Sequence, residues 1–169
     1  MPSRIWHGAR MPPRYDIKPA RGDADIAAAA QLLRAYAASL DVDLAYQGFE
    51  AELAGLPGAY QPPGGELLVA RAADGALGGC VALRPMREPE AAEMKRLYVT
   101  PGARGTGLGR ALAEAIIDCA AHLGYRSICL DTLPSMTDAI RLYRVLGFET
   151  TAPYYATPVA GTVFLRRHL

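Results

Sequence analysis

The amino-acid sequence predicts an α/β (α+β) fold, with a mixed central sheet of six or seven strands and helices on both of its faces. Apolar runs at 66–71 and 77–83, separated by Ala73-Asp74-Gly75-Ala76, are typical of an antiparallel hairpin. Residues 93–131 then contain a strand, a helix and a second strand, which implies a right-handed parallel crossover. The 169 residues, of which 51% are hydrophobic, are enough for one domain with a sizeable core.

The expected order of elements is β-α-α-β-β-β-α-β-α-β-β, and most boundaries have a local signal. The elements are a strand at 15–19, helices at 23–40 and 49–54, strands at 66–71, 77–83 and 93–99, a helix at 108–123, a strand at 127–131, a helix at 135–146, and strands at 148–151 and 161–165. Asp23 or Asp25 can cap the first helix through its carboxylate. Ser135 followed by Asp138 is a capping-box signature for the last helix. Gly124 is a stop signal for the central helix.

Composition and charge exclude several classes of function. The chain has 18 basic and 17 acidic residues, so its net charge of +1 gives no argument for binding to nucleic acid or to an anionic membrane. No apolar run reaches the roughly 18 residues of a membrane helix, and the N-terminus lacks a signal-peptide core. A cytoplasmic protein is therefore expected. Residues 1–14 lack periodicity and are expected to form a loose arm before a single domain at 15–169.

The cysteines and histidines do not form a pattern that points to a metal or to a disulfide framework. Cys80, Cys119 and Cys129 are odd in number and widely spaced. Cys119 falls on the apolar face of a helix and Cys129 in an apolar strand, so both are expected to be buried apolar side chains. No histidine cluster accompanies them, and no metal is expected.

A glycine-rich turn lies where the central strand meets the central helix. It reads Arg104-Gly105-Thr106-Gly107-Leu108-Gly109-Arg110. Glycines at the start of a helix leave backbone N–H groups uncovered, and these groups attract phosphate oxygens together with the positive end of the helix dipole. The Walker and dinucleotide patterns both fail here, because Arg110-Ala111 stands where Lys-Ser/Thr is needed and no third glycine follows at the required spacing. A turn that only tightens the junction is the alternative.

The pattern that fits is R-x-x-G-x-G, met by Arg104, Gly107 and Gly109. With this loop between the fourth strand and the third helix, the chain resembles the GCN5-related N-acetyltransferase (GNAT) superfamily, whose acetyl-CoA pyrophosphate loop has the same pattern and place. The segment Leu142-Tyr143-Arg144-Val145-Leu146-Gly147-Phe148 resembles a second motif of that superfamily, L-Y-x-x-x-G-F. The element order resembles the superfamily's over nearly all of residues 15–169.

Two single residues complete the comparison with the superfamily. Glu93 resembles the strand-four glutamate that several members use as a base. Met136 departs from the pattern, because many members have there an asparagine that contacts the cofactor.

The resemblance implies an acetyl-CoA-dependent N-acetyltransferase that moves an acetyl group to a primary amine of a small molecule or peptide by direct attack on the thioester. Acetyl-CoA would be the co-substrate, without a metal. Glu93 would take the proton of the acceptor ammonium, and Tyr143 would donate a proton to the departing thiolate. The implied cofactor-binding residues are Leu97, Tyr98, Val99, Arg104, Gly105, Thr106, Gly107, Leu108, Gly109 and Arg110. A strand-end charge and a core tyrosine are the plainer interpretations of Glu93 and Tyr143.

The acceptor side is less sharply defined. The candidate acceptor residues are Tyr36, Asp41, Arg96 and Tyr154, since the first helices and the last loop frame the acceptor cleft in the fold that the chain resembles. Simple alternation along the strand separates Lys95 from Arg96 on opposite faces, and a bulge would change that parity. The rival function is a non-catalytic acyl-CoA-binding or partner-binding domain of the same fold, and the presence of both Glu93 and Tyr143 favours the enzyme. A homodimer is left open.

Overall fold

The computed structural model describes residues 14–169, so the arm expected at 1–14 lies outside the described residues except for Arg14. The helices and strands are β1 (Tyr15–Pro19), α1 (Gly22–Ala38), α2 (Phe49–Ala54), β2 (Glu66–Ala72), β3 (Leu77–Pro85), β4 (Ala91–Val99), α3 (Leu108–His122), β5 (Ser127–Thr132), α4 (Thr137–Val145), β6 (Glu149–Thr150) and β7 (Val163–His168). Short 3₁₀ helices lie at Leu44–Gln47, Gly58–Tyr60 and Pro101–Ala103. This order is the one that the sequence predicts.

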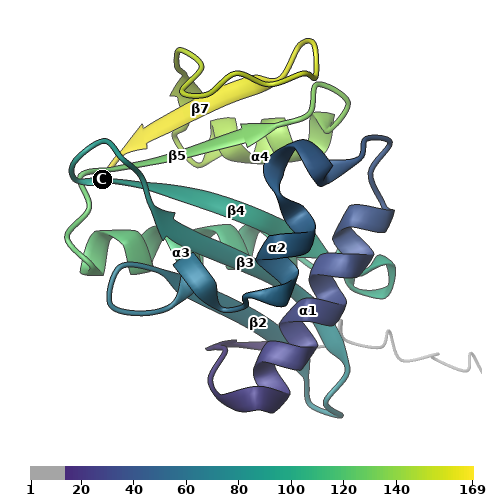
Figure 1. The fold of residues 1–169 in the computed structure, drawn as a ribbon. Coiled ribbons are helices and arrows are strands. Elements are labelled where there is room, and N and C mark those ends of the chain that lie inside the picture. Colours follow the sequence, from purple (N-terminus) through teal and green to yellow (C-terminus); the bar gives the residue numbers. More distant parts are fainter. Residues whose placement is uncertain (1–13) are drawn as a thin grey trace, which may run out of the picture.

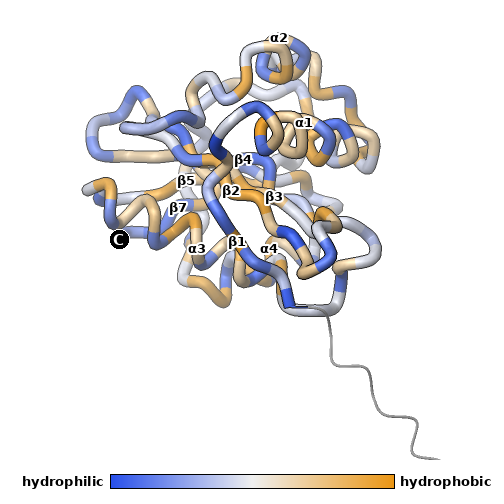
Figure 2. Tube along the Cα trace, turned by 90° about the horizontal axis from the view of Figure 1, so that it is seen from below, coloured by the Kyte–Doolittle hydropathy of each residue, from blue (hydrophilic) through white to orange (hydrophobic). Residues whose placement is uncertain are grey.

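One mixed sheet of seven strands, in the order β1-β2-β3-β4-β5-β7-β6, runs through the described part of the chain (Figure 1). Neighbouring strands are antiparallel except β4 and β5, which are parallel and joined through α3. Helices α1 and α2 cover one face of the sheet, and α3 and α4 cover the other (Figures 1 and 2). The predicted α/β fold with helices on both faces is therefore confirmed.

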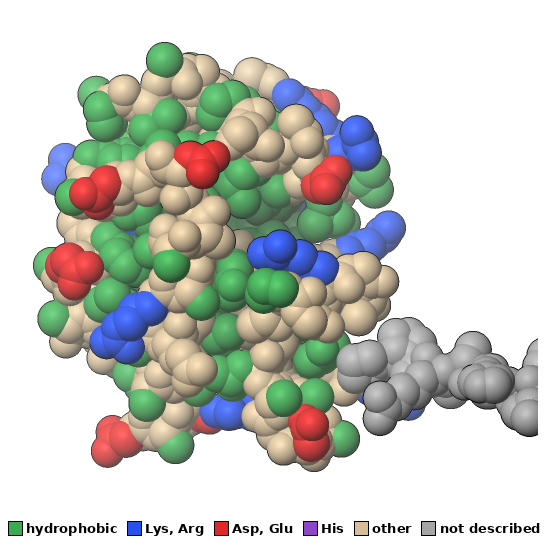
Figure 3. Space-filling model, turned by 90° about the vertical axis from the view of Figure 1, so that its right-hand side faces the viewer, with side chains coloured by type: hydrophobic (Ala, Val, Ile, Leu, Met, Phe, Trp, Pro, Cys, Tyr) green, Lys and Arg blue, Asp and Glu red, His purple; other side chains and the backbone are tan. Residues whose placement is uncertain are grey.

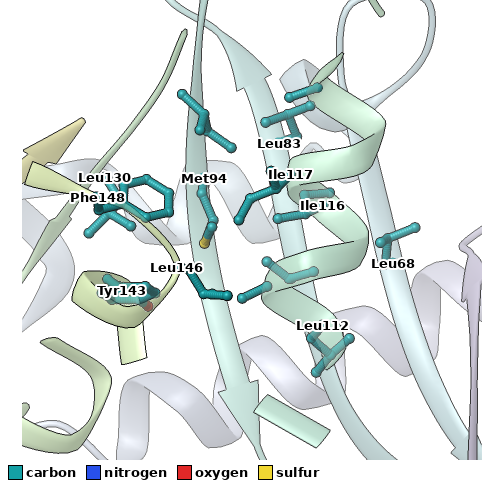
Figure 4. Close-up of a cluster of buried hydrophobic side chains, with 14 of the residues drawn as sticks. Leu68, Leu83, Met94, Leu112, Ile116, Ile117, Leu130, Tyr143, Leu146 and Phe148 are labelled. Atoms are coloured by element: carbon teal, nitrogen blue, oxygen red, sulfur yellow. The ribbon is translucent and has the colours of Figure 1, made fainter. Parts of the chain in front are cut away.

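Each face of the sheet has its own apolar core. Leu112 and Ile116 recur at helical spacing on α3 and pack on the side chains of Leu68 and Leu83 in the sheet (Figure 4). On the other face, α1 contributes Leu33 to a second cluster. Burying a side chain of this size contributes roughly 1.5–3 kcal/mol. The strands β2, β3 and β4 contribute side chains to both cores, so the centre of the sheet is packed on both faces.

Two predicted helix caps are wrong. Helix α1 begins after Arg21 without a side-chain cap, and Asp25 instead accepts a hydrogen bond from the backbone N–H of Arg21 at 3.0 Å. Helix α4 begins after Met136, also without a side-chain cap. The turn before it is closed by backbone bonds, in which Met136 N–H donates to the Leu133 carbonyl at 3.0 Å, so Ser135 is not needed as a cap.

A bulge in β4 overturns the simple alternation expected for this strand. Arg96 has a φ of 60°, and the pairing with β3 skips a residue, so that Tyr98 faces Cys80 whereas Lys95 faces Ala82. Because one extra residue reverses the parity beyond it, Lys95 and Arg96 both lie on the side of α2, and Leu97 joins the core under α3.

Strands β4 and β5 are paired over a short stretch only. Their register runs from Ala91 opposite Ser127 to Glu93 opposite Cys129, and the two strands diverge beyond it (Figure 1). The divergence opens the middle of the sheet. It leaves side chains at the ends of two parallel strands around a wedge-shaped space, where ligands commonly bind in sheets of this kind.

Candidate active site

Two cavities lie at the open end of β4 and β5. The first, here called the wedge cavity, lies between the diverging strands and has a volume of about 40 Å³. Its lining includes Tyr36, Gln47, Lys95, Arg96, Leu97, Asp131, Met136 and Tyr143. The second, here called the α4 groove, has a volume of about 490 Å³ and includes Tyr36, Leu97, Tyr98, Val99, Arg104, Gly109, Met136 and Leu142 in its lining. Figure 3 looks onto this side of the molecule, where hydrophobic side chains lie in a hollow bordered by charged ones.

The two cavities meet at three shared residues. Tyr36, Leu97 and Met136 line both of them. Leu97 directly follows the bulged residue Arg96, so the bulge turns the strand at the junction. A molecule in the α4 groove and a molecule in the wedge cavity would therefore touch beside Leu97.

The glycine-rich turn leads into α3 at the edge of the α4 groove. Gly107 is the N-cap of α3 with a φ of 84°, and a Cβ added there would meet nothing within 4 Å. Its positive φ explains the glycine, and the open space leaves room for a ligand at the helix start. Arg104 and Gly109 line the groove. Arg110, also predicted to bind the cofactor, is exposed and pairs with Glu114 at 2.8 Å.

The other predicted residues of the cofactor loop have local roles. Thr106 is half-buried, and its hydroxyl donates to the Ala103 carbonyl at 2.6 Å. Leu108 is buried in the core under the sheet. Gly105 has a φ of 74° and open space around its Cα. The predicted strand residues Leu97, Tyr98 and Val99 all line the α4 groove.

Tyr143 lies at the wall of the wedge cavity. Its ring packs edge-on against Phe148, with 5.8 Å between the ring centroids (Figure 4). Its hydroxyl makes no hydrogen bond to any group within residues 14–169, although the residue is only 7% exposed. Burial raises the pKa of Tyr143 above its ordinary value, so the phenol stays protonated. The phenol of this lining residue thus has a proton that no group within residues 14–169 accepts.

Glu93 is buried and surrounded by cations. Its Oε2 lies 3.0 Å from the guanidinium of Arg84, and its Oε1 lies 3.5 Å from the Lys95 ammonium. The Tyr154 hydroxyl donates to the same Oε1 at 3.4 Å. Glu93 is not part of the lining of the wedge cavity. Glu93 therefore contacts Lys95, which lines that cavity, but does not line the cavity itself.

Asp131, which sequence reasoning missed, and Lys95, which it weighed beside Arg96 without selecting it, both line the wedge cavity. Asp131 lies near the end of β5, and its Oδ2 accepts a hydrogen bond from the Tyr155 hydroxyl at 2.6 Å. Lys95 Nζ lies 3.3 Å from Gln47 Oε1, and burial lowers the pKa of Lys95 although Glu93 opposes this effect. A polar residue after the apolar run Ile128-Cys129-Leu130, at the end of a parallel strand, was the signal that could have identified Asp131.

Two of the four predicted acceptor residues line a cavity, and two do not. Tyr36 lines both cavities, and Arg96 lines the wedge cavity. The Arg96 guanidinium is already held, because its Nε donates to Glu52 at 2.9 Å. Tyr154 and Asp41 line neither cavity: Tyr154 packs on Phe164, and Asp41 is exposed.

The three thiols are separate from this site. Cys80 and Cys129 are buried, as expected for Cys129, whereas Cys119 is only half-buried. Burial raises the pKa of Cys80 to about 12 and that of Cys129 to about 11, so both stay protonated. Within residues 14–169, no group of three or more His, Cys, Asp or Glu side chains could hold a metal ion. No helix in that range is long and apolar enough to cross a bilayer.

The fold and the two meeting cavities define a protein with two adjoining ligand sites, and comparison with known proteins identifies its family. The sequence profile of the acetyltransferase (GNAT) family matches residues 29–148. An uncharacterized N-acetyltransferase of Schizosaccharomyces pombe is 44% identical over 135 residues, which cover 80% of this chain and 83% of that protein. The chain therefore belongs to the acetyltransferase (GNAT) family and is an acyltransferase.

Solved structures agree with this assignment. A GCN5-related N-acetyltransferase from Kribbella flavida matches with a TM-score of 0.66 and 26% identity, over 92% of this chain and 98% of that one. The yncA protein of Salmonella typhimurium, solved with its cofactor acetyl-CoA, has the same fold, with a TM-score of 0.64 and 23% identity over 92% of this chain and 94% of its own.

Proposed function

We propose that this protein is an acetyl-CoA-dependent N-acetyltransferase that moves the acetyl group to a primary amine of a small molecule or peptide by direct attack on the thioester. The observation that carries the proposal is the junction of the two cavities at Leu97, together with Tyr143 in the lining of the wedge cavity. Acetyl-CoA would occupy the α4 groove, and the acceptor would enter the wedge cavity.

The donor side is supported by the start of α3. Its backbone N–H groups and the Arg104 guanidinium would hold the pyrophosphate, because helix N-termini and cations both attract phosphate oxygens. The backbone of Leu97 to Val99 would run along the pantetheine arm. The structure of the Salmonella protein with acetyl-CoA, on the same fold, supports this choice of ligand.

The acceptor amine must lose a proton before it can attack, since an alkylammonium has no lone pair. Glu93 was the predicted base, but Arg84 and Lys95 hold its oxygens and it lies outside the wedge cavity lining. Asp131 lines the cavity and uses only Oδ2 for Tyr155. We therefore propose that Asp131 accepts the proton of the acceptor ammonium, and that Glu93 holds Lys95 in place.

The remaining steps are the attack of the amine, the cleavage of the carbon–sulfur bond and the transfer of a proton to the leaving thiolate. The neutral amine adds to the thioester carbonyl carbon, and the carbon–sulfur bond breaks. Tyr143 gives its phenolic proton to the leaving thiolate and recovers one from the acetylated nitrogen. The net reaction converts an alkylammonium and acetyl-CoA into an acetamide, free CoA and one proton, which Asp131 releases to water.

A first test is to assay a panel of amines, amino acids and peptides with acetyl-CoA while following the release of free thiol. We expect turnover with at least one acceptor. Tight binding of acetyl-CoA without turnover across the panel would contradict the enzyme hypothesis and favour the rival hypothesis, a non-catalytic acyl-CoA-binding domain. Three statements remain predictions from the sequence: the cytoplasmic location, the absence of a nucleic-acid partner and the absence of a membrane partner. The sequence leaves a homodimer open.

The glycine-rich turn gives a second prediction. Acetyl-CoA at about 100 times its dissociation constant should stabilise the parent protein by about 2.7 kcal/mol, a rise in melting temperature of roughly 5–10 °C. Gly107→Asp places a carboxylate where the pyrophosphate would bind, so most of this rise should be lost. The measurement is thermal unfolding with and without acetyl-CoA.

Gly124→Asp is the matched control for this substitution. Gly124 has a φ of 89° and open space around its Cα, like Gly107, but it lies at the other end of α3. Both variants strain the backbone alike, and only Gly107→Asp should abolish the acetyl-CoA effect. An equal rise in melting temperature for the two variants would show that the turn does not bind the cofactor.

A further inference from the structure

We infer that the acceptor is a free α-amino acid with an apolar side chain, bound with its ammonium on Asp131 and its carboxylate on Lys95. The inference rests on the proposed function, since it places the acceptor amine in the wedge cavity. It selects the small molecule over the peptide, a choice that the proposed function leaves open.

Lys95 is a buried cation whose contacts are incomplete. Its side chain is 6% exposed, and its ammonium has two contacts, at 3.3 Å to Gln47 and 3.5 Å to Glu93. Both are longer than the roughly 2.7–2.9 Å of a strong charged hydrogen bond. Both partners are also shared, because Gln47 Oε1 accepts from Arg96 at 2.8 Å and Glu93 bonds Arg84 at 3.0 Å. A buried cation is stable when it is well paired, so Lys95 favours an anion in the cavity.

Asp131 lies across the same cavity. Glu93 and Cys129 face each other at the last paired position of the parallel strands. Lys95 and Asp131 each stand two residues further along, so their side chains lie on the same face of the two diverging strands. Both line the wedge cavity, yet they form no ion pair with each other. The cavity thus has a cation on one wall and a carboxylate on the other.

An α-amino acid matches this arrangement. Its ammonium and carboxylate are separated by one carbon, so the cavity of about 40 Å³ has to admit only this charged end of the molecule. The remaining lining includes Leu40, Leu44, Leu133 and Met136, which would contact an apolar side chain. A peptide N-terminus has an amide in place of the carboxylate, and a simple alkylamine has nothing there. Both would leave Lys95 without its anion.

Three acceptors of matched shape test the inference on the parent protein. Leucine carries the carboxylate, leucinamide replaces it by a neutral amide, and 3-methylbutylamine lacks it. With acetyl-CoA saturating, we expect kcat/KM per ammonium form of the acceptor to be about 10–100-fold higher for leucine than for either analogue, the usual effect of one hydrogen bond to a charged group. Equal values, or a preference for the amine, would overturn the inference while leaving the N-acetyltransferase intact.

A substitution at Lys95 adds an independent measurement. Lys95→Met removes the ammonium and keeps a similar length, so the preference for leucine over 3-methylbutylamine should fall to near one, mainly through KM. Lys18→Met is the control, because Lys18 is the other lysine of the chain and is exposed on β1. A leucine preference that survives in Lys95→Met would contradict the inference. If that variant does not fold, the comparison of the three acceptors with the parent protein still tests the inference. Absence of turnover with every amine, despite acetyl-CoA binding, would instead reject the proposed function.

Discussion

Asp131→Asn should lower kcat/KM for acetyl transfer by roughly 10²–10⁴-fold, the usual range for loss of a general base. The amide has the shape of the carboxylate and can still accept the 2.6 Å hydrogen bond from Tyr155, so the fold and the acetyl-CoA groove should be unaffected. Only the charge and the basic oxygen are lost. The measurement is the rate of CoA release, together with the rise in melting temperature that acetyl-CoA causes.

Glu93→Gln is the variant that separates the two carboxylates. Glu93 is 4% exposed and pairs with Arg84 and Lys95, so the amide should destabilise the fold by about 3–5 kcal/mol, the cost of breaking a buried ion pair. The rate per folded molecule should fall less than in Asp131→Asn. Asp118→Asn, on the exposed side of α3, is a control for loss of a carboxylate. If Glu93→Gln is nearly inactive and Asp131→Asn is active, then Glu93 is the general base, as the sequence predicted.

Tyr143→Phe should lower kcat and kcat/KM by the same factor, about 10–10³-fold, because the hydroxyl would act only in the transition state. Phenylalanine keeps the ring contact with Phe148, and the lost hydroxyl has no protein partner within residues 14–169. Thermal stability should therefore change little. Burial raises the pKa of Tyr143 above the ordinary value of 10.0, so no fall in kcat should arise from its ionisation below pH 10. Steady-state rates and thermal unfolding on the same preparation measure both effects.

Tyr125→Phe is the matched control for the phenol. The Tyr125 hydroxyl donates to the Gly64 carbonyl at 2.6 Å, and Tyr125 is absent from the lining of both cavities. Its loss should reduce stability by about 0.5–1.5 kcal/mol and leave the rate per folded molecule unchanged. Full turnover in Tyr143→Phe would remove that residue from the mechanism. A loss of stability without a loss of rate would make it a core tyrosine.

The sequence by itself determined the element order, the family and the residues of the glycine-rich turn. These features depend on local signals: helical spacing in α3, glycine and proline at turns, and short motifs such as the one that contains Tyr143. Local signals are strong because the residues that produce them are neighbours in the chain. The failed caps at Asp23, Asp25 and Ser135 show the limit, since backbone bonds in the turn before α4 made a side-chain cap unnecessary.

The tertiary structure alone decided how the site is assembled. One extra residue in β4 placed Lys95 and Arg96 on the same face, and no local sequence pattern predicts such a bulge. Glu93 became an ion-paired residue because Arg84 and Lys95 lie against it, and Asp131 reached the cavity because β5 diverges from β4 after Cys129. These contacts join segments that are distant in the chain. Their geometry depends on the strand register and on packing between both cores, which residue type and spacing do not specify.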